Sequence, residues 1–235
     1  MLLRHLPLLF AFPVLASAAS FDCGKVTSRM EKMICGSPTL SALDESLAAA
    51  YKAAGKDRDN GALSLDQRQW LKNTRDACRD AACVEKAGNE RLALLTRWHE
   101  PEAPNDSIYG NYVLAREISF YSPQGSSVEK ADDCLVIKKG RNGIDFSINL
   151  IQSNGHTCSI DGSATLAGNV YSFVPGKDQA GLANCQLRLK VKRHTIELED
   201  ADGACRAYAC GMRAGLDRIE FLRSRKVAKS CANPG

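Results

Sequence analysis

Ten cysteines constrain the fold of this 235-residue chain more than any other feature. All of them follow an apolar leader, and their number is even. An even set in an exported chain favours disulfides, because oxidising compartments allow these bonds to form and persist. Metal ligation or redox chemistry would be the alternatives. The chain has no CxxC and no histidine pair at zinc-site spacing, so we expect structural bridges and no cofactor.

The leader, MLLRHLPLLFAFPVLASAAS, has the parts of a secretory signal peptide. A basic start precedes an apolar stretch from Leu6 to Leu15, and Ala16-Ser17-Ala18 is a small-residue cleavage pattern. We expect cleavage after Ala18, which makes residues 1–18 a signal peptide. The residues before Cys23, SFD, lack the small side chains of a lipid-attachment site. The sequence therefore predicts a periplasmic or secreted protein with no membrane anchor.

Residues 99–107, HEPEAPNDS, read as an exposed linker, because they hold two prolines and no large apolar residue. The cysteines divide evenly around it, so that each half can close its own bridges. We expect a four-cysteine helical domain over residues 19–98 and a six-cysteine β domain over residues 108–235. The cysteines are Cys23, Cys35, Cys78 and Cys83 in the first, and Cys134, Cys158, Cys185, Cys205, Cys210 and Cys231 in the second.

The first half shows the apolar period of amphipathic helices. Ser28 and Glu31 form a capping-box pattern before a helix that ends near Cys35. Further helices are expected from Pro38 to about Gly55, from the second capping pattern of Ser64 and Gln67 toward Cys78, and from about Cys83 to Trp98.

The second half changes to short, often alternating segments rich in β-branched and aromatic residues. Clusters of Gly, Asn and Asp separate them, as turns do between antiparallel strands. The fold class is therefore α+β, with an N-terminal disulfide-stapled helical module and a C-terminal antiparallel β-barrel-like domain. The expected strands are NYVLARE, CLVIKK, IDFSINLI, SATLAG, VYSFV, CQLRLKV, TIELED and RIEFLR.

Bridges between helices are favoured for the first four cysteines. In a continuous helix Cys78 and Cys83 would lie about 7.5 Å apart along the axis, beyond the Cα separation of about 7 Å that a disulfide spans. Cys23 could reach Cys35 only if the segment before the helix doubled back. We expect nested Cys35–Cys78 and Cys23–Cys83 bridges, and the connectivity of the other six cysteines stays open.

Three segments of the first half carry a resemblance to a known family: FDC…EKMIC (21–35), LSALDESLAAAY (40–51) and QRQWLKNTRDAC (67–78). With Cys83 and a final helix, they resemble the N-terminal domain family of the lysozyme inhibitor LprI over about residues 21–97. The resemblance implies a disulfide-stapled helical module in exported bacterial proteins, with members linked to lysozyme inhibition.

The second half, with GNY (110–112) and NGHTCSIDGSA (154–164), is similar to the barrel-type lysozyme inhibitors of the MliC kind. Their inhibitory loop does not align here residue by residue, so no contact residues follow. Animal-type lysozymes are strongly basic, and an inhibitor gains steering from an acidic face. This chain carries a net charge of +4, which leaves ELEDADG (197–203) as the local acidic candidate.

Four residues are candidates for partner binding: Tyr208, Arg206, Arg213 and His156. The first three lie in CRAYACGMRAGLD (205–217), and Tyr and Arg are frequent interface anchors. The same segment could instead be a disulfide-tied closure of the barrel. His156 could serve a nucleophilic Cys158 if that thiol were free. A bridged Cys158 would leave a turn or packing histidine.

The chain has no phosphate loop, nucleophile elbow or metal cluster, and its charge does not suggest nucleic-acid binding. We expect a binding protein and not an enzyme, most concretely an inhibitor that occludes the cleft of a lysozyme or another cell-wall hydrolase. The alternative is a non-inhibitory envelope module that binds peptidoglycan, lipopolysaccharide, another anionic envelope polymer or an envelope protein. A carrier with a small apolar ligand in its barrel is a third possibility.

Overall fold

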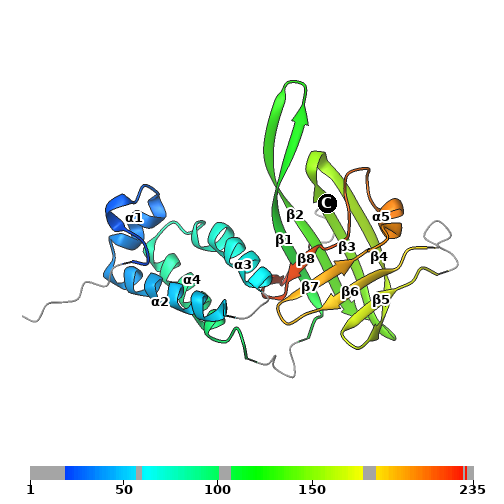
Figure 1. The fold of residues 1–235 in the computed structure, drawn as a ribbon, viewed down its shortest axis with the longest axis horizontal. Coiled ribbons are helices and arrows are strands. Elements are labelled where there is room, and N and C mark those ends of the chain that lie inside the picture. Colours follow the sequence, from blue (N-terminus) through cyan, green and yellow to red (C-terminus); the bar gives the residue numbers. More distant parts are fainter. Residues whose placement is uncertain (1–18, 57–59, 101–106, 177–183, 230, 232–235) are drawn as a thin grey trace, which may run out of the picture. The chain divides into compact units, whose positions relative to one another are not determined.

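The computed structural model describes residues 19–56, 60–100, 107–176, 184–229 and 231. The expected signal peptide and residues 101–106 of the expected linker lie outside this part. The chain forms two compact units (Figure 1). One comprises Met1–Arg58 and Thr74–His99, and the other comprises Asp59–Asn73 and Glu100–Gly235. The α+β fold class is confirmed, with helices in the first part and a barrel-like antiparallel sheet in the second.

The described residues of the helical unit form η1 (Cys23–Lys25), α1 (Arg29–Cys35), α2 (Pro38–Ala54) and α4 (Ala81–Thr96). The predicted capping box is confirmed, since Ser28 caps the Glu31 amide and the Glu31 carboxylate returns to the Ser28 backbone. Gly88 of α4 allows close packing on α2, because a Cβ there would meet Leu43. The helices bury one small cluster of Met30, Ile34, Leu40, Cys78, Val84 and Ala87.

The expected Cys35–Cys78 and Cys23–Cys83 bridges are wrong. Cys23 bonds Cys35 and Cys78 bonds Cys83, with Cα separations of 5.8 Å and 5.5 Å. Helix does not continue between Cys78 and Cys83, because Asp80 caps a new helix, and this break brings the two Cα atoms within bridging distance. Cys23 reaches Cys35 through the turn of η1. Both closed loops are short, so the chain-entropy gain is about 2–3 kcal/mol each.

The described residues of the second unit form a nine-stranded antiparallel sheet of order β8-β7-β6-β5-β4-β3-β2-β1-β9. Its last two strands flank η5 (Arg223–Arg225); one pairs with β7 and the other with β1. This segment brings both edges together into a nearly closed barrel. The strands are β1 (Gly110–Ser122), β2 (Gly125–Lys139), β3 (Gly143–Gln152), β4 (His156–Ala167), β5 (Val170–Phe173), β6 (Leu187–Val191), β7 (Thr195–Glu199), β8 (Glu220–Leu222) and β9 (Lys226–Val227).

Side chains fill the interior of the described barrel. Phe146 and Phe173 pack edge to face at 5.4 Å, and Gly162 leaves the room that the Phe173 ring occupies. Fully buried aliphatic residues complete this core, among them Leu135, Ile148, Leu187, Leu189 and Ile196. The described barrel is thus a packed core, which gives no support to the carrier possibility.

Helix α3 (Asn60–Trp70) and η2 (Leu71–Arg75), a π-helical turn, pack on the sheet, although they were expected in the helical domain. Leu65 packs against the barrel core. The buried Asp66 accepts a hydrogen bond from Ser224 Oγ at 2.8 Å, and Gln69 Nε2 donates to the carbonyl of Ala115 at 2.8 Å. Helix α3 therefore bridges β1 and η5, where the two edges of the sheet meet.

The expected start of this helix at Ser64 is also wrong. Helix α3 begins four residues earlier, and Ser64 Oγ accepts a hydrogen bond from Arg68 at 2.8 Å inside it.

Three nested disulfides tie the sheet unit: Cys134–Cys231, Cys158–Cys210 and Cys185–Cys205. The first joins β2 to the segment after β9. The other two hold the short helix α5 (Ala204–Ala209), one at its start and one just after its end. Helix α5 is thereby fixed to β4 and to the segment before β6.

Candidate partner-binding site

Strands β1 and β2 form a hairpin that extends beyond the barrel (Figure 1). Their pairing runs out to Ser122 and Gly125, which leaves a two-residue turn. Strand β3 pairs with β2 only from Cys134 onward, and β9 pairs with β1 only at Asn111 and Tyr112. Residues 117–130, here called the projecting hairpin, therefore pair with no other strand in the described part of the chain.

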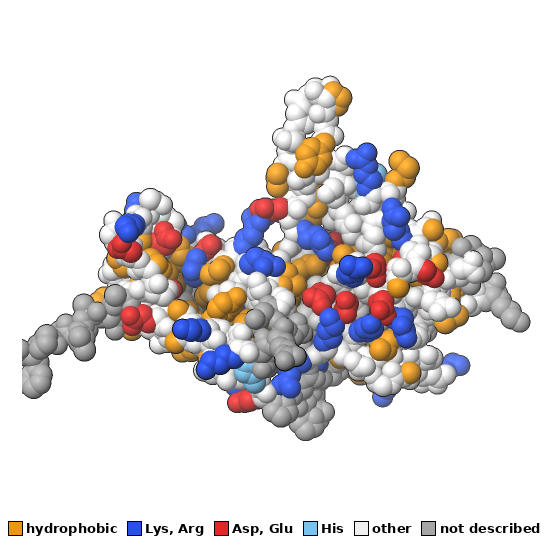
Figure 2. Space-filling view, viewed as in Figure 1, with side chains coloured by type: hydrophobic (Ala, Val, Ile, Leu, Met, Phe, Trp, Pro, Cys, Tyr) orange, Lys and Arg blue, Asp and Glu red, His pale blue; other side chains and the backbone are white. Residues whose placement is uncertain are grey.

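The projecting hairpin has two different faces, because side chains alternate along a strand. Ile118 is buried and Phe120 half-buried on the inner face. On the outer face Tyr121 and Val128 are 66% and 63% exposed. Tyr121 pairs with Ser126 and Val128 with Ser119, which makes Tyr121 and Val128 diagonal neighbours. Figure 2 shows hydrophobic side chains along this projection.

The turn η3 (Ser153–Gly155) holds the middle of the hairpin in place. The Tyr121 amide donates a hydrogen bond to Asn154 Oδ1 at 2.8 Å. The Phe120 ring lies against Gly155, where a Cβ would come within 3.3 Å of it. Asn154 and Gly155 have φ angles of 57° and 69°, a left-handed conformation that Asn and Gly tolerate best.

Asp133 anchors the base of the hairpin, at the point where β2 separates from β3. Its fully buried carboxylate forms an ion pair with Arg116 and accepts the Ile151 amide at 2.8 Å. The Asp133 side chain thus takes the place of a backbone carbonyl as the acceptor for the Ile151 amide, at the point where the pairing of β2 with β3 ends. Burial raises the pKa of Asp133 above its usual range, although Arg116 and the Ile151 amide act in the opposite direction.

The second half of α5 and the segment that follows it, together with His156, form a second exposed region, here called the shoulder (residues 206–213 with His156). Tyr208 and Met212 are 58% and 84% exposed, and Arg213 is exposed. Arg206 donates to the carbonyls of Met212 and Ala214, both at 2.7 Å. Its guanidinium therefore shapes the loop that presents Met212 and Arg213.

The structure brings the four candidate residues around this one loop. The Nδ1 atom of His156 would lie 3.2 Å from a Cβ at Gly211, and the Gly211 amide donates to the Thr157 carbonyl at 2.8 Å. Cys158 is bonded to Cys210, so His156 has no thiol partner there for nucleophilic chemistry.

Hairpin and shoulder share one end of the barrel. The turn η3 contacts β1 and leads directly into His156, at the start of β4. The loop after the shoulder covers this end, with Ala214 and Leu216 buried and two hydrogen bonds between Gln152 and Gly215.

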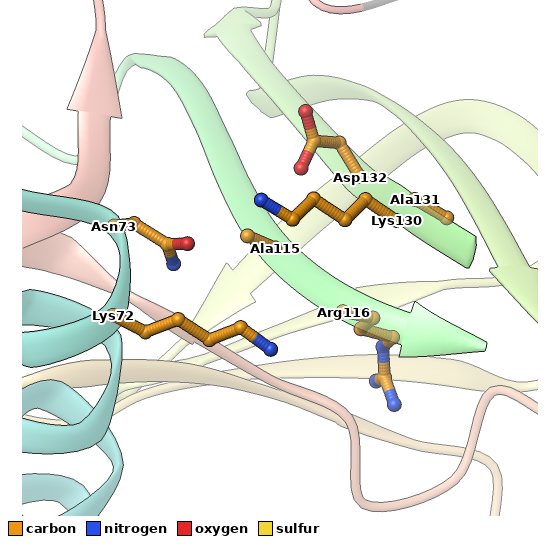
Figure 3. A pocket seen from close by; sticks show the side chains of 7 residues that line it. All are labelled: Lys72, Asn73, Ala115, Arg116, Lys130, Ala131 and Asp132. Atoms are coloured by element: carbon orange, nitrogen blue, oxygen red, sulfur yellow. The ribbon is translucent and has the colours of Figure 1, made fainter. Parts of the chain in front are cut away.

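A hollow of about 230 Å³ lies at the foot of the hairpin (Figure 3). Lys72 of η2 pairs with Glu117, which holds the pKa of that carboxyl below its usual range. The hollow is lined by Lys72, Asn73, Ala115, Arg116, Lys130, Ala131 and Asp132.

The projecting hairpin was not among the expected strands, which ended at Glu117 and resumed at Cys134. Residues 125–133, GSSVEKADD, are mostly polar and resemble a loop. The signals that could have located it are the alternation of Ile118 and Phe120 and a proline two residues before Gly125.

The expected acidic patch at residues 197–203 is neutralised within the fold. Lys192 pairs with Glu197 at 2.9 Å, and Lys190 pairs with Glu199 at 2.7 Å. Asp200 is buried and accepts the amides of Cys205 and Arg206. These carboxylates do not form a free acidic face.

Comparison with known proteins finds partial matches. "Lipoprotein LprI" from Mycobacterium tuberculosis and from Mycobacterium bovis is 34% identical over 80 residues. Over this stretch the chain is distantly similar to LprI. The match covers 32% of this chain and 40% of each relative, so this chain spans well under half of their length. No protein-family profile and no solved structure matches, and the similarity to MliC-type inhibitors gains no support.

The relation to LprI and the five disulfides indicate an exported protein. The LprI relatives are named lipoproteins, whereas in this chain the Cys23 sulfur is bonded to Cys35 and cannot also carry a thioether-linked lipid. Among the helices in the described residues, none has the length and apolar character to cross a membrane.

Proposed function

We propose that this protein binds and inhibits a lysozyme or a related cell-wall hydrolase by placing the projecting hairpin in the substrate cleft. The observation that carries the proposal is the hairpin itself, a braced protrusion with exposed Tyr121 and Val128. The relation to LprI supports the partner class, through the lysozyme inhibition to which that family is linked.

The shape of the hairpin suits a long cleft. From Glu117 to Ser122 the strand is six residues long, which corresponds to about 20 Å of extended chain. A glycoside hydrolase that binds several sugar rings has a groove of this kind, and a two-stranded ribbon is narrow enough to enter it. The brace at η3 and the ion pair at Asp133 fix the hairpin before binding, which reduces the ordering entropy lost in the complex.

The chemistry of the hairpin favours apolar contact over charge steering. Glu117, Glu129 and Lys130 nearly cancel, and Tyr121 offers a large surface with a polar hydroxyl. Met212 and Tyr208 on the shoulder are further exposed side chains at this end of the barrel. We therefore expect affinity that changes little with salt, unlike that of an acidic inhibitor of a basic enzyme.

The test is a titration of the oxidised protein against lysozymes of the animal, goose and invertebrate types, with bacterial cell lysis as the readout. We expect stoichiometric inhibition of at least one type. The double variant Tyr121→Ala/Val128→Ala should bind about 100-fold more weakly, as the loss of two central contacts predicts.

A matched control is Leu166→Ala, because Leu166 is 52% exposed on β4, ten residues along the chain from His156. This variant should inhibit like the unchanged protein. No inhibition of any type at large molar excess would refute the proposal and leave the envelope-binding alternative. Equal losses in the hairpin variant and the control would refute the role of the hairpin.

A further inference from the structure

The hollow at the foot of the hairpin combines fixed donors and acceptors in a small space. Asn73 Nδ2 donates to Gln69 Oε1 at 2.7 Å, and Gln69 donates in turn to the Ala115 carbonyl at 2.8 Å. This chain of hydrogen bonds orients the Asn73 amide and leaves its oxygen as an acceptor. In Figure 3 the ammonium group of Lys130 extends across the hollow on the side of Ala115 and Asn73.

The charges around the hollow cancel in pairs. Lys72 pairs with Glu117, and Arg116 pairs with the buried Asp133. Lys130 and Asp132 remain, and neither forms an ion pair with any residue in the described part of the chain. One free cation and one free anion leave no net charge. The hollow therefore does not favour a strongly anionic polymer.

We propose that this hollow binds one pyranose ring of a neutral saccharide. The volume of about 230 Å³ lies below the 300–1,000 Å³ typical of drug-sized ligands, which suits a single ring. Sugar hydroxyls both donate and accept hydrogen bonds. Asp132 and Asn73 provide acceptors, Lys72 and Lys130 provide donors, and Ala115 offers an apolar contact.

The outer face of the hairpin extends this site into a track. Ala115, Glu117, Ser119 and Tyr121 lie on one face by strand alternation, over about 20 Å. A saccharide chain with one ring in the hollow can therefore run toward the exposed Tyr121 ring. This inference concerns a saccharide ligand and does not depend on binding of a hydrolase.

The test uses the oxidised full-length mature chain, titrated with N-acetylglucosamine tetramer and, separately, with cellotetraose, while backbone amide shifts are followed by NMR. We expect saturable shifts at residues 115–117 and 130–132 with at least one probe. Asp132→Ala and Asn73→Ala should each raise the Kd about tenfold, since each removes a hydrogen-bonding group. Asp161→Ala is the control, because Asp161 is an exposed carboxylate of β4.

Shifts that do not saturate, or a Kd unchanged in both Asp132→Ala and Asn73→Ala, would overturn the saccharide site. A loss in Asp161→Ala equal to that in Asp132→Ala would overturn it as well. The lysis assay on Asp132→Ala separates the two proposals: retained inhibition with lost saccharide binding assigns them to different surfaces. A protein that binds saccharide without inhibiting any lysozyme would refute the proposed function alone.

Discussion

Asn154 provides the sharpest test of how the hairpin is held. It combines a left-handed backbone with a side chain that accepts the Tyr121 amide at 2.8 Å. Asn154→Gly removes the acceptor and keeps a residue that adopts positive φ freely. Asn154→Ala removes the same acceptor and adds a Cβ that disfavours this conformation. The two variants therefore separate the hydrogen bond from the backbone conformation.

The expected magnitudes follow from these two effects. Loss of one intramolecular hydrogen bond costs about 1 kcal/mol, and the left-handed conformation costs alanine at least about 1 kcal/mol more. Asn154→Gly should thus destabilise this turn by about 1 kcal/mol or less and Asn154→Ala by about 2 kcal/mol. A change of about 1 kcal/mol corresponds to about fivefold faster exchange of the Tyr121 amide.

The assay is amide hydrogen exchange by NMR, with urea unfolding in parallel and the amides of β5 to β7 as an internal reference. Both variants should speed exchange at Tyr121, and only Asn154→Ala should lose clearly in unfolding free energy. Inhibition should weaken in both, because a looser hairpin loses more entropy on binding. Unchanged exchange at Tyr121 in Asn154→Gly would refute the hydrogen bond as the brace, and equal stability of the two variants would refute the left-handed backbone.

Three other perturbations test the base of the hairpin, the seam of the barrel and the longest bridge. The pKa of Asp133 in the folded state is raised above its usual value of 3.8, so its contribution to stability is fully present below that pH and is lost as the pH rises. The unfolding free energy of the unchanged protein minus that of Asp133→Asn, from urea titrations, should therefore fall as the pH rises above 3.8. A rise would contradict this. A fragment of residues 100–235 lacks α3, whereas a fragment of residues 59–235 retains it. Because α3 hydrogen-bonds β1 and η5, the shorter fragment should melt at a lower temperature when unfolding is followed by circular dichroism. Equal melting temperatures would show that α3 does not support the sheet. Cys134→Ala/Cys231→Ala opens a loop of 97 residues and should cost roughly 4–5 kcal/mol in urea unfolding, whereas a loss under about 1 kcal/mol would contradict the chain-entropy argument.

Local sequence patterns predicted most of the helices and strands, because the interactions that define a helix or a strand act over a few residues. The capping box at Ser28 and Glu31 acts within one turn and was predictable. Each of the eight expected strands overlaps an observed one, because alternation marks a sheet with one buried face. The packing of α3 was not predictable, since an amphipathic face is equally satisfied by helices or by a sheet. Cys78 was misassigned because one break in the helix changes which cysteines can meet.

The candidate site was predictable only in part, for a related reason. Tyr208, Arg206 and Arg213 are close in sequence, so their grouping needed no long-range knowledge. That His156 joins them depends on the Cys158–Cys210 bridge, and a single pair of this kind is present in only three of the fifteen possible connectivities of six cysteines. The projecting hairpin exists because β3 stops pairing with β2 at Cys134 while β1 and β2 continue to pair with each other. The sequence of β2 does not indicate this position. The hydrogen bonds from Arg206 to the carbonyls of its own loop were also not predictable, because they depend on the folded path of that loop.

The position of α3 affects how such chains could exchange their parts. The segment 67–78, which carries part of the resemblance to LprI, includes the end of a helix that is committed here to the sheet. Recombination at the linker would separate this helix from the surface it covers, although each half would keep all its disulfides. A chain with the helical module and a different second half would need another surface to bury Leu65 and to hydrogen-bond Asp66 and Gln69. Exchange of the second half is therefore expected to destabilise α3 even though every disulfide is retained.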